Sequence, residues 1–304
     1  MSINETHSNS EARADLWTWR AVWALAEALP IFKEHNSNIA EEIESTIKKA
    51  LNASIILKKN YPQKVDFMGF QLPGWLPMQF AADQAAVLVK GLVPYYQYTS
   101  DPEARELIQM MADGIMLMQA GDSTHFPYNA LLSWKNLWHA YGNSQSDVLI
   151  QAGIILKDEK YLKSAFREIN HFYPFLIKNG YLKFFTLKLE KDQIQSDEQK
   201  QFEQIAYNIR PMVFAGLGAY NLTGEEFYIK QAAEAACWLL GKNISAQALY
   251  NPQTGRCFDG IVSKIDVNYN SGAESTIEAL LALLEIEKNA TAKKIVHNFY
   301  RKKN

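Results

Sequence analysis

Five segments of the chain are apolar almost without interruption, and each is long enough for several helical turns. Their residue ranges are 21–32, 85–96, 148–156, 211–222 and 277–286. A helix that is apolar on every side is buried on every side, so these segments predict five helices in the interior. Each is followed by a segment with charges along one face, such as residues 39–51 and 225–240. This second pattern predicts a helix with one side in water.

The apolar segments recur at a steady interval. They begin at residues 21, 85, 148, 211 and 277, which gives spacings of 64, 63, 63 and 66 residues. The turns inside the pairs also match, because "DEKYLKSA" (158–165) parallels "EEFYIKQA" (225–232). A period of this length indicates a repeated helical hairpin. Strand patterns are weak by comparison, and the best candidate is residues 180–190.

Buried helices that alternate with half-exposed helices predict an inner ring inside an outer ring. This pattern is similar to the (α/α) toroids of six-hairpin glycosidases and their relatives. The stretch "TGEEFYIKQA" (223–232) resembles the inner-to-outer turn of these proteins, and "NYNSGAESTIEALLAL" (268–283) resembles the last hairpin of bacterial toroid proteins associated with glycan processing. The resemblance implies an all-α toroid in one domain, residues 1–304. We count five hairpins, as in alginate-lyase-like proteins, and leave a sixth open.

The connections between hairpins are long, whereas the turns within hairpins are short. The long connections cover roughly residues 60–78, 120–132, 178–198 and 242–270. In a ring of hairpins they all fall at one end, beside the N-termini of the inner helices. Long loops on a rigid scaffold are where binding and catalysis concentrate, so we expect the main pocket at this end. Aromatic residues are dense in these loops, where they either stack on a sugar or seal the core.

Acidic residues at this end are the candidates for catalysis. They are Glu274, Asp259, Asp122 and Asp15. Hydrolysis of a glycoside with inversion needs two carboxylates roughly 6.5–9.5 Å apart, one to donate a proton and one to activate water. Ser271 and Glu274 also fit the spacing of a capping box, and a carboxylate held in this way keeps lone pairs for a ligand. Each of the other three acids equally fits a turn or a helix cap.

Further residues are candidates for holding a substrate. They are Trp75, His125, Trp138, His139, Asn143, Tyr207, Arg210, Asn268 and Asn270. His139 and Asn143 have i, i+4 spacing, and Tyr207 and Arg210 have i, i+3 spacing, so each pair shares a face of a helix. These residue types suit β-elimination of a uronate, in which Asn and Arg neutralise the carboxylate and Tyr or His removes a proton. A core position is the competing interpretation for His139.

Composition and motifs narrow the classes of function. The formal net charge of −2 and the pI of about 6.3 give no electrostatic footprint for nucleic acid. No segment approaches the roughly 20 apolar residues of a membrane span. The two cysteines and six histidines show no metal-binding spacing, and no nucleotide-binding motif is present, so we expect neither a metal nor a cofactor. The polar N-terminus lacks a signal peptide, which favours the cytoplasm.

The leading hypothesis is therefore a carbohydrate-active enzyme, a glycoside hydrolase with paired carboxylates, and it depends partly on analogy between folds. A polysaccharide lyase is the first alternative. A non-catalytic glycan-binding or scaffold domain is the second. The expected partner is a carbohydrate, with no nucleic acid and no membrane, and a homo-oligomer is left open.

Overall fold

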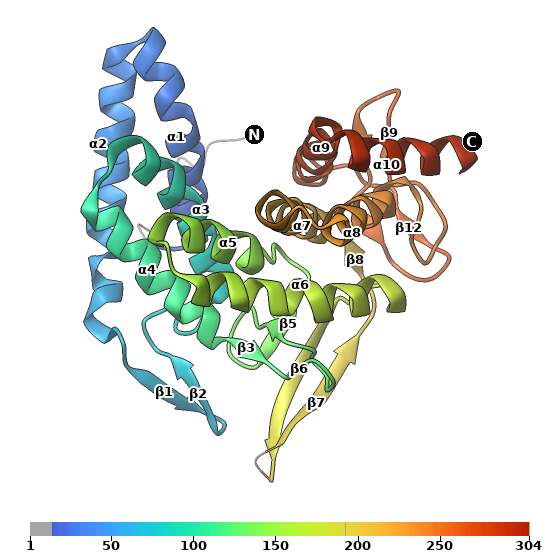
Figure 1. The fold of residues 1–304 in the computed structure, drawn as a ribbon, viewed down its shortest axis with the longest axis horizontal. Helices are drawn as coiled ribbons and strands as arrows, with labels where there is room; N and C mark the ends of the chain where they lie inside the picture. Colours follow the sequence, from blue (N-terminus) through green and yellow to red (C-terminus); the bar gives the residue numbers. More distant parts are fainter. Residues whose placement is uncertain (1–13, 192, 304) are drawn as a thin grey trace, which may run out of the picture.

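The computed structural model describes residues 14–191 and 193–303, which contain ten α-helices arranged as five consecutive hairpins (Figure 1). The inner helices are α1 (Leu16–His35), α3 (Ala82–Thr99), α5 (Gln145–Leu156), α7 (Ile209–Thr223) and α9 (Ala273–Lys288). The outer helices are α2 (Ser37–Ser54), α4 (Pro102–Leu117), α6 (Glu159–Asn179), α8 (Glu226–Cys237) and α10 (Ala290–Lys303). Each apolar segment lies in an inner helix, so the predicted five-hairpin (α/α) toroid is confirmed.

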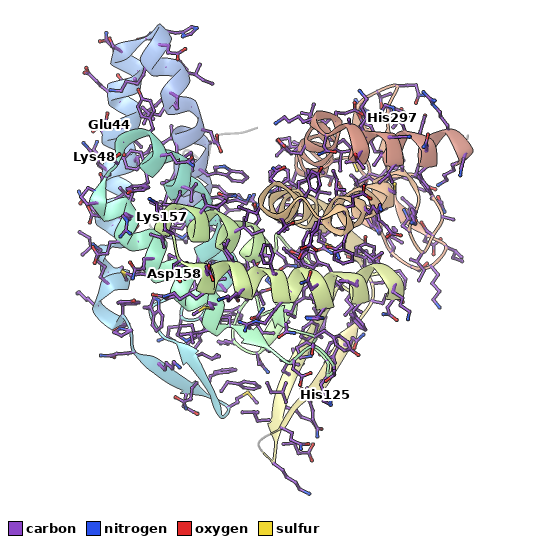
Figure 2. All side chains as sticks on the ribbon, viewed as in Figure 1. Glu44, Lys48, His125, Lys157, Asp158 and His297 are labelled. Atoms are coloured by element: carbon purple, nitrogen blue, oxygen red, sulfur yellow. The ribbon has the colours of Figure 1, made fainter. Side chains whose placement is uncertain are left out.

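Successive inner helices pack against one another in chain order, from α1 through α3, α5 and α7 to α9. The turns within hairpins are short, and a residue with left-handed backbone ends three of the inner helices, α3, α5 and α7. A polar side chain caps α2, α4 and α6. At the turn labelled in Figure 2, Lys157 has φ 56° and the Asp158 side chain accepts a hydrogen bond from Lys160 N. Such caps satisfy the free N–H groups of the next helix.

The long connections contain three 3₁₀ helices and short antiparallel strands. The 3₁₀ helices are η1 (Ile55–Asn60), η2 (Ala206–Asn208) and η3 (Trp238–Leu240). The strands are β1 (Lys64–Phe67), β2 (Phe70–Pro73), β3 (Gln119–Ala120), β4 (Ala130–Leu131), β5 (Leu137–His139), β6 (Phe184–Glu190), β7 (Gln193–Lys200), β8 (Gln204–Ile205), β9 (Tyr250–Asn251), β10 (Arg256–Cys257), β11 (Gly260–Ile261) and β12 (Val267–Asn268).

Two of these strand pairs form arms that project from one side of the molecule, β1–β2 and β6–β7 (Figure 1). The expected strand at 180–190 is confirmed as β6. It pairs with β7 in antiparallel register, with Phe184 opposite Lys200 and Glu190 opposite Gln193, and the register shifts between Thr186 and Leu187. On its other edge β6 pairs with β5, so the arm is tied to the connection that leads into α5.

Aromatic residues fill the core beneath the β5–β6 pair. The rings of Trp138 and Phe185 stack with centroids 5.5 Å apart, and Phe172 on α6 packs edge-on against both. Trp75 is also buried, and its Nε1 donates to Met110 O at 2.8 Å. Both tryptophans were candidates for binding a substrate. The structure places them in the core, where their rings are covered by protein.

The inner helices differ in how completely they are covered. Val213 and Leu217 on α7 are buried, as expected for an inner helix. On α9, Leu280 is only partly buried and Leu284 is exposed, so the expectation that this helix is buried on all sides is wrong. The reason is its position at the end of the row, where α7, α8 and α10 are its neighbours. None of the described helices is long and apolar enough to cross a bilayer.

Candidate active site

A cavity of about 550 Å³ lies between the N-terminal halves of the inner helices. Its walls come from α1, α3, α7 and α9 and from the residues that lead into α5 and α7. They include Trp17, Arg20, Trp23, Lys90, Gly142, Tyr207, Arg210, Glu274 and Glu278. The long connections enter the inner helices at this end, so the cavity lies at the predicted end of the ring. Its volume is in the range of small-molecule sites.

Arg20 joins the two helices at the ends of the row. Its guanidinium donates to Glu274 Oε1 at 3.0 and 3.1 Å and also contacts the hydroxyl of Tyr207. Burial lowers the pKa of Arg20, but Tyr207 and Glu274 outweigh that effect, and the pKa is raised. Arg20 is therefore a fixed cation at the mouth of the cavity. It holds the Glu274 carboxylate beside the cavity.

The predicted capping box at the start of α9 is wrong. Ser271 Oγ donates to Cys257 O at 2.9 Å, and the cap residue of α9 is Gly272, which has no side chain to make a capping bond. Asp259 takes over this role because its Oδ1 accepts from Gly272 N at 3.0 Å and from Ser275 Oγ at 2.5 Å. Glu274 is therefore free of a capping bond, and its carboxylate pairs with Arg20 instead.

Two buried ion pairs lie deeper in the cavity. Lys90 Nζ on α3 is 2.5 Å from Asp147 Oδ2 on α5, and Arg210 Nε on α7 is 2.5 Å from Glu278 Oε2 on α9. Burial lowers the pKa of Lys90, although Asp147 opposes this effect. Pairing offsets the large cost of removing such charges from water, so the two pairs tie α3 to α5 and α7 to α9.

The ring of Trp23 lies between the two cations of these pairs. Its centroid is 5.0 Å from Lys90 Nζ and 5.3 Å from Arg210 Cζ, and the ring of Phe214 makes similar contacts with both. One donor nonetheless remains unused, because Arg210 Nη1 is buried and has no hydrogen-bond partner among the described residues. Leaving a buried donor unsatisfied costs on the order of 1–3 kcal/mol, and more for a charged group. This donor is covered by protein, so the Arg210 guanidinium is held in the cavity wall by its pair with Glu278 and by the two rings.

Asp83 and His139 form a half-buried pair close to this end of α3. Asp83 is followed on the same helical face by Val87 and Lys90, which line the cavity. His139 Nε2 is 3.2 Å from Asp83 Oδ2, and His139 Nδ1 accepts from Tyr141 N at 3.1 Å. The acceptor role of Nδ1 means that Nε2 carries the proton of the neutral imidazole and points it at Asp83.

A buried polar network lies beside this pair. Ser133 Oγ donates to Asn143 Oδ1 at 3.2 Å, and Asn143 Nδ2 donates to Asn208 Oδ1 at 3.4 Å. His139 N donates in turn to Ser133 Oγ at 3.0 Å. Asn143, a predicted binding residue, is thus engaged in holding the segment before α5 against the segment before α7.

Several other predicted residues lie outside the cavity lining. Asp15 caps α1 by accepting from Trp17 N at 3.1 Å. Asn268 Oδ1 accepts from Asn270 N, and Asn270 O accepts from Asp259 N, so this pair shapes the loop before α9. Asp122 and His125 pair at 2.8 Å on an exposed turn, and hydrogen bonds from Thr124 and His125 lower the pKa of Asp122. Figure 2 shows His125 on the side of the β6–β7 arm, away from α9.

The structure therefore brings together three of the predicted residues, Glu274, Tyr207 and Arg210, in the wall of one cavity. Sequence reasoning missed several polar or aromatic residues in or near it, which include Trp17, Arg20, Trp23, Asp83, Lys90, Asp147 and Glu278. A signal was present for some of them. Lys90 and Glu278 are isolated charges within apolar segments, where a charge has to be paired. No group of His, Cys, Asp and Glu within the described part of the chain could hold a metal ion.

Comparison with solved structures identifies the architecture. The chain is similar to the unsaturated glucuronyl hydrolase of Bacillus sp. GL1, with a TM-score of 0.61 and 13% identity over 94% of this chain and 73% of that one. It is also similar to the GH76A α-1,6-mannanase of Salegentibacter sp. HEL1_6, with a TM-score of 0.58 and 14% identity over 93% and 75% of the two chains. The chain is likewise similar to an unsaturated glucuronyl hydrolase of Streptococcus agalactiae, with a TM-score of 0.59 and 12% identity over 94% of this chain and 68% of that one.

These neighbours are (α/α) toroid glycosidases, so the resemblance expected from the sequence is confirmed at the level of fold. No protein-family model matches the chain, and no curated protein matches its sequence significantly. At identities of 12–14% the likeness establishes the architecture alone. The activity has to be argued from the cavity itself.

Proposed function

We propose that this protein is a glycoside hydrolase that binds its saccharide in the cavity between α1 and α9. The observation that carries the proposal is a cavity wall that combines indole rings, the half-buried guanidinium of Arg20 and the accessible carboxylate of Glu274. A sugar matches this set, because its ring faces pack on Trp17 and Trp23 while its oxygens accept from Arg20. The fold that positions these groups is one that glycosidases use.

Glu274 and Asp83 are the carboxylates that we assign to the chemistry. Asp147 and Glu278 are committed to buried cations, and removing either from its pair would leave an uncompensated charge. Glu274 is exposed at the cavity mouth and paired with Arg20, and we assign it the role of general base or nucleophile. Asp83 lies 3.2 Å from His139 Nε2, and we assign the general acid to this pair. Asp259, Asp122 and Asp15 are assigned to caps and turns.

The charge state of Tyr207 argues against a lyase. If Tyr207 removed the proton in elimination from a uronate, its phenol would have to act as a base in its ionised form. Burial, reinforced by Glu278, raises the pKa of Tyr207, although Arg20 and Arg210 oppose this effect. The phenolate is thus disfavoured even with two cations nearby. Tyr207 is better suited to hold Arg20 in place through the contact between its hydroxyl and the guanidinium.

The comparison structures also bear on the choice of residues. The Salegentibacter mannanase is inactive when two consecutive aspartates are replaced. This chain contains no two consecutive aspartates, so a mechanism that depends on such a pair is not available to it. The carboxylates therefore have to come from separate elements, as Asp83 on α3 and Glu274 on α9 do.

The test is to compare the wild-type chain with Glu274→Gln and Asp83→Asn on a panel of saccharides. The panel contains α-1,6-mannotetraose, an unsaturated glucuronyl disaccharide and a polyuronate. New reducing ends indicate hydrolysis, and ultraviolet absorbance of a new double bond indicates elimination. We expect the wild-type chain to release reducing ends. The rate of this release should fall on the order of 10²-fold or more in each of the two variants. Glu226→Gln, on an exposed carboxylate of α8, is the matched control and should retain full activity.

Three outcomes contradict the proposal. Elimination in place of hydrolysis would favour the lyase, and unchanged hydrolysis by Glu274→Gln would remove this residue from the chemistry. Saccharide binding without any turnover on the panel would favour the glycan-binding domain.

We also place the protein in the cytoplasm, because both cysteines are free and buried thiols, which suits a reducing compartment.

A further inference from the structure

One buried serine bonds to both members of the Asp83–His139 pair. Ser133 lies between β4 and β5, and its side chain is fully buried. Its carbonyl oxygen accepts from Asp83 N at 3.2 Å, and its Oγ accepts from His139 N at 3.0 Å. The two bonds join the first turn of α3 to the end of β5. Ser133 therefore connects the two elements that bring Asp83 Oδ2 within 3.2 Å of His139 Nε2.

The bond to Asp83 N takes the place of a helix cap. The cap residue of α3 is Ala81, whose methyl group makes no capping bond. The first N–H groups of a helix have no partner within the helix, and Ser133 O supplies one for Asp83 from a distant segment. Asp83 Oδ1 in turn accepts from Gln84 N at 2.7 Å. The carboxylate is thus held with its other oxygen toward His139.

The bond to His139 N holds one edge of β5. Successive N–H groups of an antiparallel strand point to opposite edges. Ala140 N donates to Lys183 O on the side of β6, so His139 N points the other way and meets Ser133 Oγ. The hydroxyl hydrogen has Asn143 Oδ1 at 3.2 Å and His139 O at 3.4 Å as acceptors. With either acceptor the hydroxyl oxygen keeps a lone pair for His139 N.

We propose that Ser133 is a positioning residue, which holds the Asp83–His139 pair in the geometry from which it protonates the leaving oxygen. The inference rests on the proposed function, in which this pair is the general acid. Removal of the hydroxyl leaves the carbonyl bond to Asp83 N intact but leaves His139 N in the interior without its acceptor. The end of β5 then shifts relative to α3. A misplacement of about 1 Å is enough to lower a rate by about 10²-fold.

The test compares two leaving groups with wild type, Ser133→Ala and Asp83→Asn. A general acid is needed when a sugar oxygen leaves, whereas fluoride leaves as a stable anion without a proton. The substrates are the panel saccharide that the wild type cleaves fastest and the glycosyl fluoride of the sugar on the glycosyl side of the cleaved bond. We expect Ser133→Ala to lose about tenfold or more in kcat/KM on the saccharide and to keep most of its kcat/KM on the fluoride. Asp83→Asn should show the same selectivity with a larger loss.

Ser164→Ala is the matched control. Ser164 on α6 is also fully buried, and its Oγ donates to Gln119 Oε1 at 3.1 Å. This variant loses a buried hydroxyl without touching the pair, so it should keep its kcat/KM on both substrates. Urea unfolding verifies that each variant is folded and compares the losses of stability. A purely structural role for Ser133 predicts equal losses on saccharide and fluoride, because a smaller folded fraction lowers both rates alike.

A second measurement needs no activity. His139 Nδ1 accepts from Tyr141 N, so the proton of the neutral ring lies on Nε2 and faces Asp83. Long-range ¹H–¹⁵N NMR spectra report this tautomer, and His139→Gln assigns the signal among the histidines. We expect one Nε2–H tautomer in the wild type and a mixture of tautomers in Ser133→Ala.

Three results would overturn the positioning role. They are equal losses of Ser133→Ala on the two substrates, no loss on the saccharide, and a His139 spectrum that Ser133→Ala leaves unchanged. A wild-type chain that cleaves no saccharide of the panel contradicts the proposed hydrolase instead. In that case the His139 spectra still decide whether Ser133 holds the pair, so the two failures are distinguishable.

Discussion

The buried pair of Lys90 and Asp147 gives the sharpest test of how the cavity is held together. The two side chains are 4% and 7% exposed, and Nζ is 2.5 Å from Oδ2. Lys90→Met keeps an unbranched apolar stem beside Trp23 but removes the charge. Asp147 then remains buried without its cation, because the nearby Arg210 is already paired with Glu278.

The expected loss follows from the burial of both partners. Breaking a buried ion pair by removing one partner costs about 3–5 kcal/mol, because the remaining charge is uncompensated. That is a large fraction of the 5–15 kcal/mol by which domains are typically stable. The double variant Lys90→Met/Asp147→Asn removes both charges and keeps a side-chain oxygen for the bond from Gln151 Nε2, which is 2.9 Å long in the wild-type chain. It should recover at least about 2 kcal/mol of the loss.

Urea unfolding of the wild type, the two single variants and the double variant measures this cycle. The slopes of the transitions should agree, so that a shift in midpoint reports the free energy of unfolding. The reasoning is refuted if Lys90→Met costs less than about 1 kcal/mol, the range of a solvent-exposed pair. It is equally refuted if the double variant loses the sum of the two single losses, since additive losses mean that the two groups do not interact.

Two further predictions concern Glu168 and Gly142. Burial raises the pKa of Glu168 to about 7, so the folded chain holds this proton more tightly than the unfolded chain. The resulting stability should be present below pH 4.5 and lost as the pH rises through 7, by up to roughly 3 kcal/mol. Urea unfolding at pH 5 and pH 8 measures this difference, and Glu168→Gln should reduce it. A variant with the same difference in free energy of unfolding as the wild type would contradict the prediction. Gly142 has φ +76°, and a Cβ there would lie 2.5 Å from Tyr207 Cε1, so Gly142→Ala should cost about 1–2 kcal/mol and lower the hydrolysis rate by displacing Tyr207 from Arg20. A Gly142→Ala variant that unfolds and hydrolyses its substrate like the wild type would contradict the contact between this position and Tyr207.

The fold could be predicted because its cause is local in the sequence. An inner helix has to be apolar on every side, and this requirement repeats at a near-constant interval, so five hairpins are visible in the order of residues alone. The end of the ring that holds the cavity followed from the lengths of the connections. The coverage of α9 did not follow, because whether a helix has neighbours on all sides depends on how far the row extends around the ring.

The site could be predicted only in part because its contacts join distant segments. Arg20 and Glu274 are 254 residues apart in the chain, and nothing in the sequence near either residue indicates the other. Local rules instead favoured a capping bond between Ser271 and Glu274. In the structure Ser271 bonds to Cys257 O, Asp259 caps α9, and Glu274 is left for Arg20. Local spacing thus identified a carboxylate that lines the cavity but assigned it the wrong partner.

The absence of a polar face on α9 now has a physical explanation in which each face of the helix has its own task. Ala279, Ala282 and Ile286 are buried within the protein. Ile277 and Leu281 continue the face of Glu274 and line the cavity, where an apolar surface suits the ring faces of a sugar. Leu283 and Leu284 line the groove beside α10. With the core on one side, the cavity on another and the groove on a third, no side of the helix is required to be polar along its whole length. The polar residues are therefore confined to its two ends. Glu274 and Glu278 pair with Arg20 and Arg210 in the first turns, and Glu285, Glu287 and Lys288 lie in the last turns.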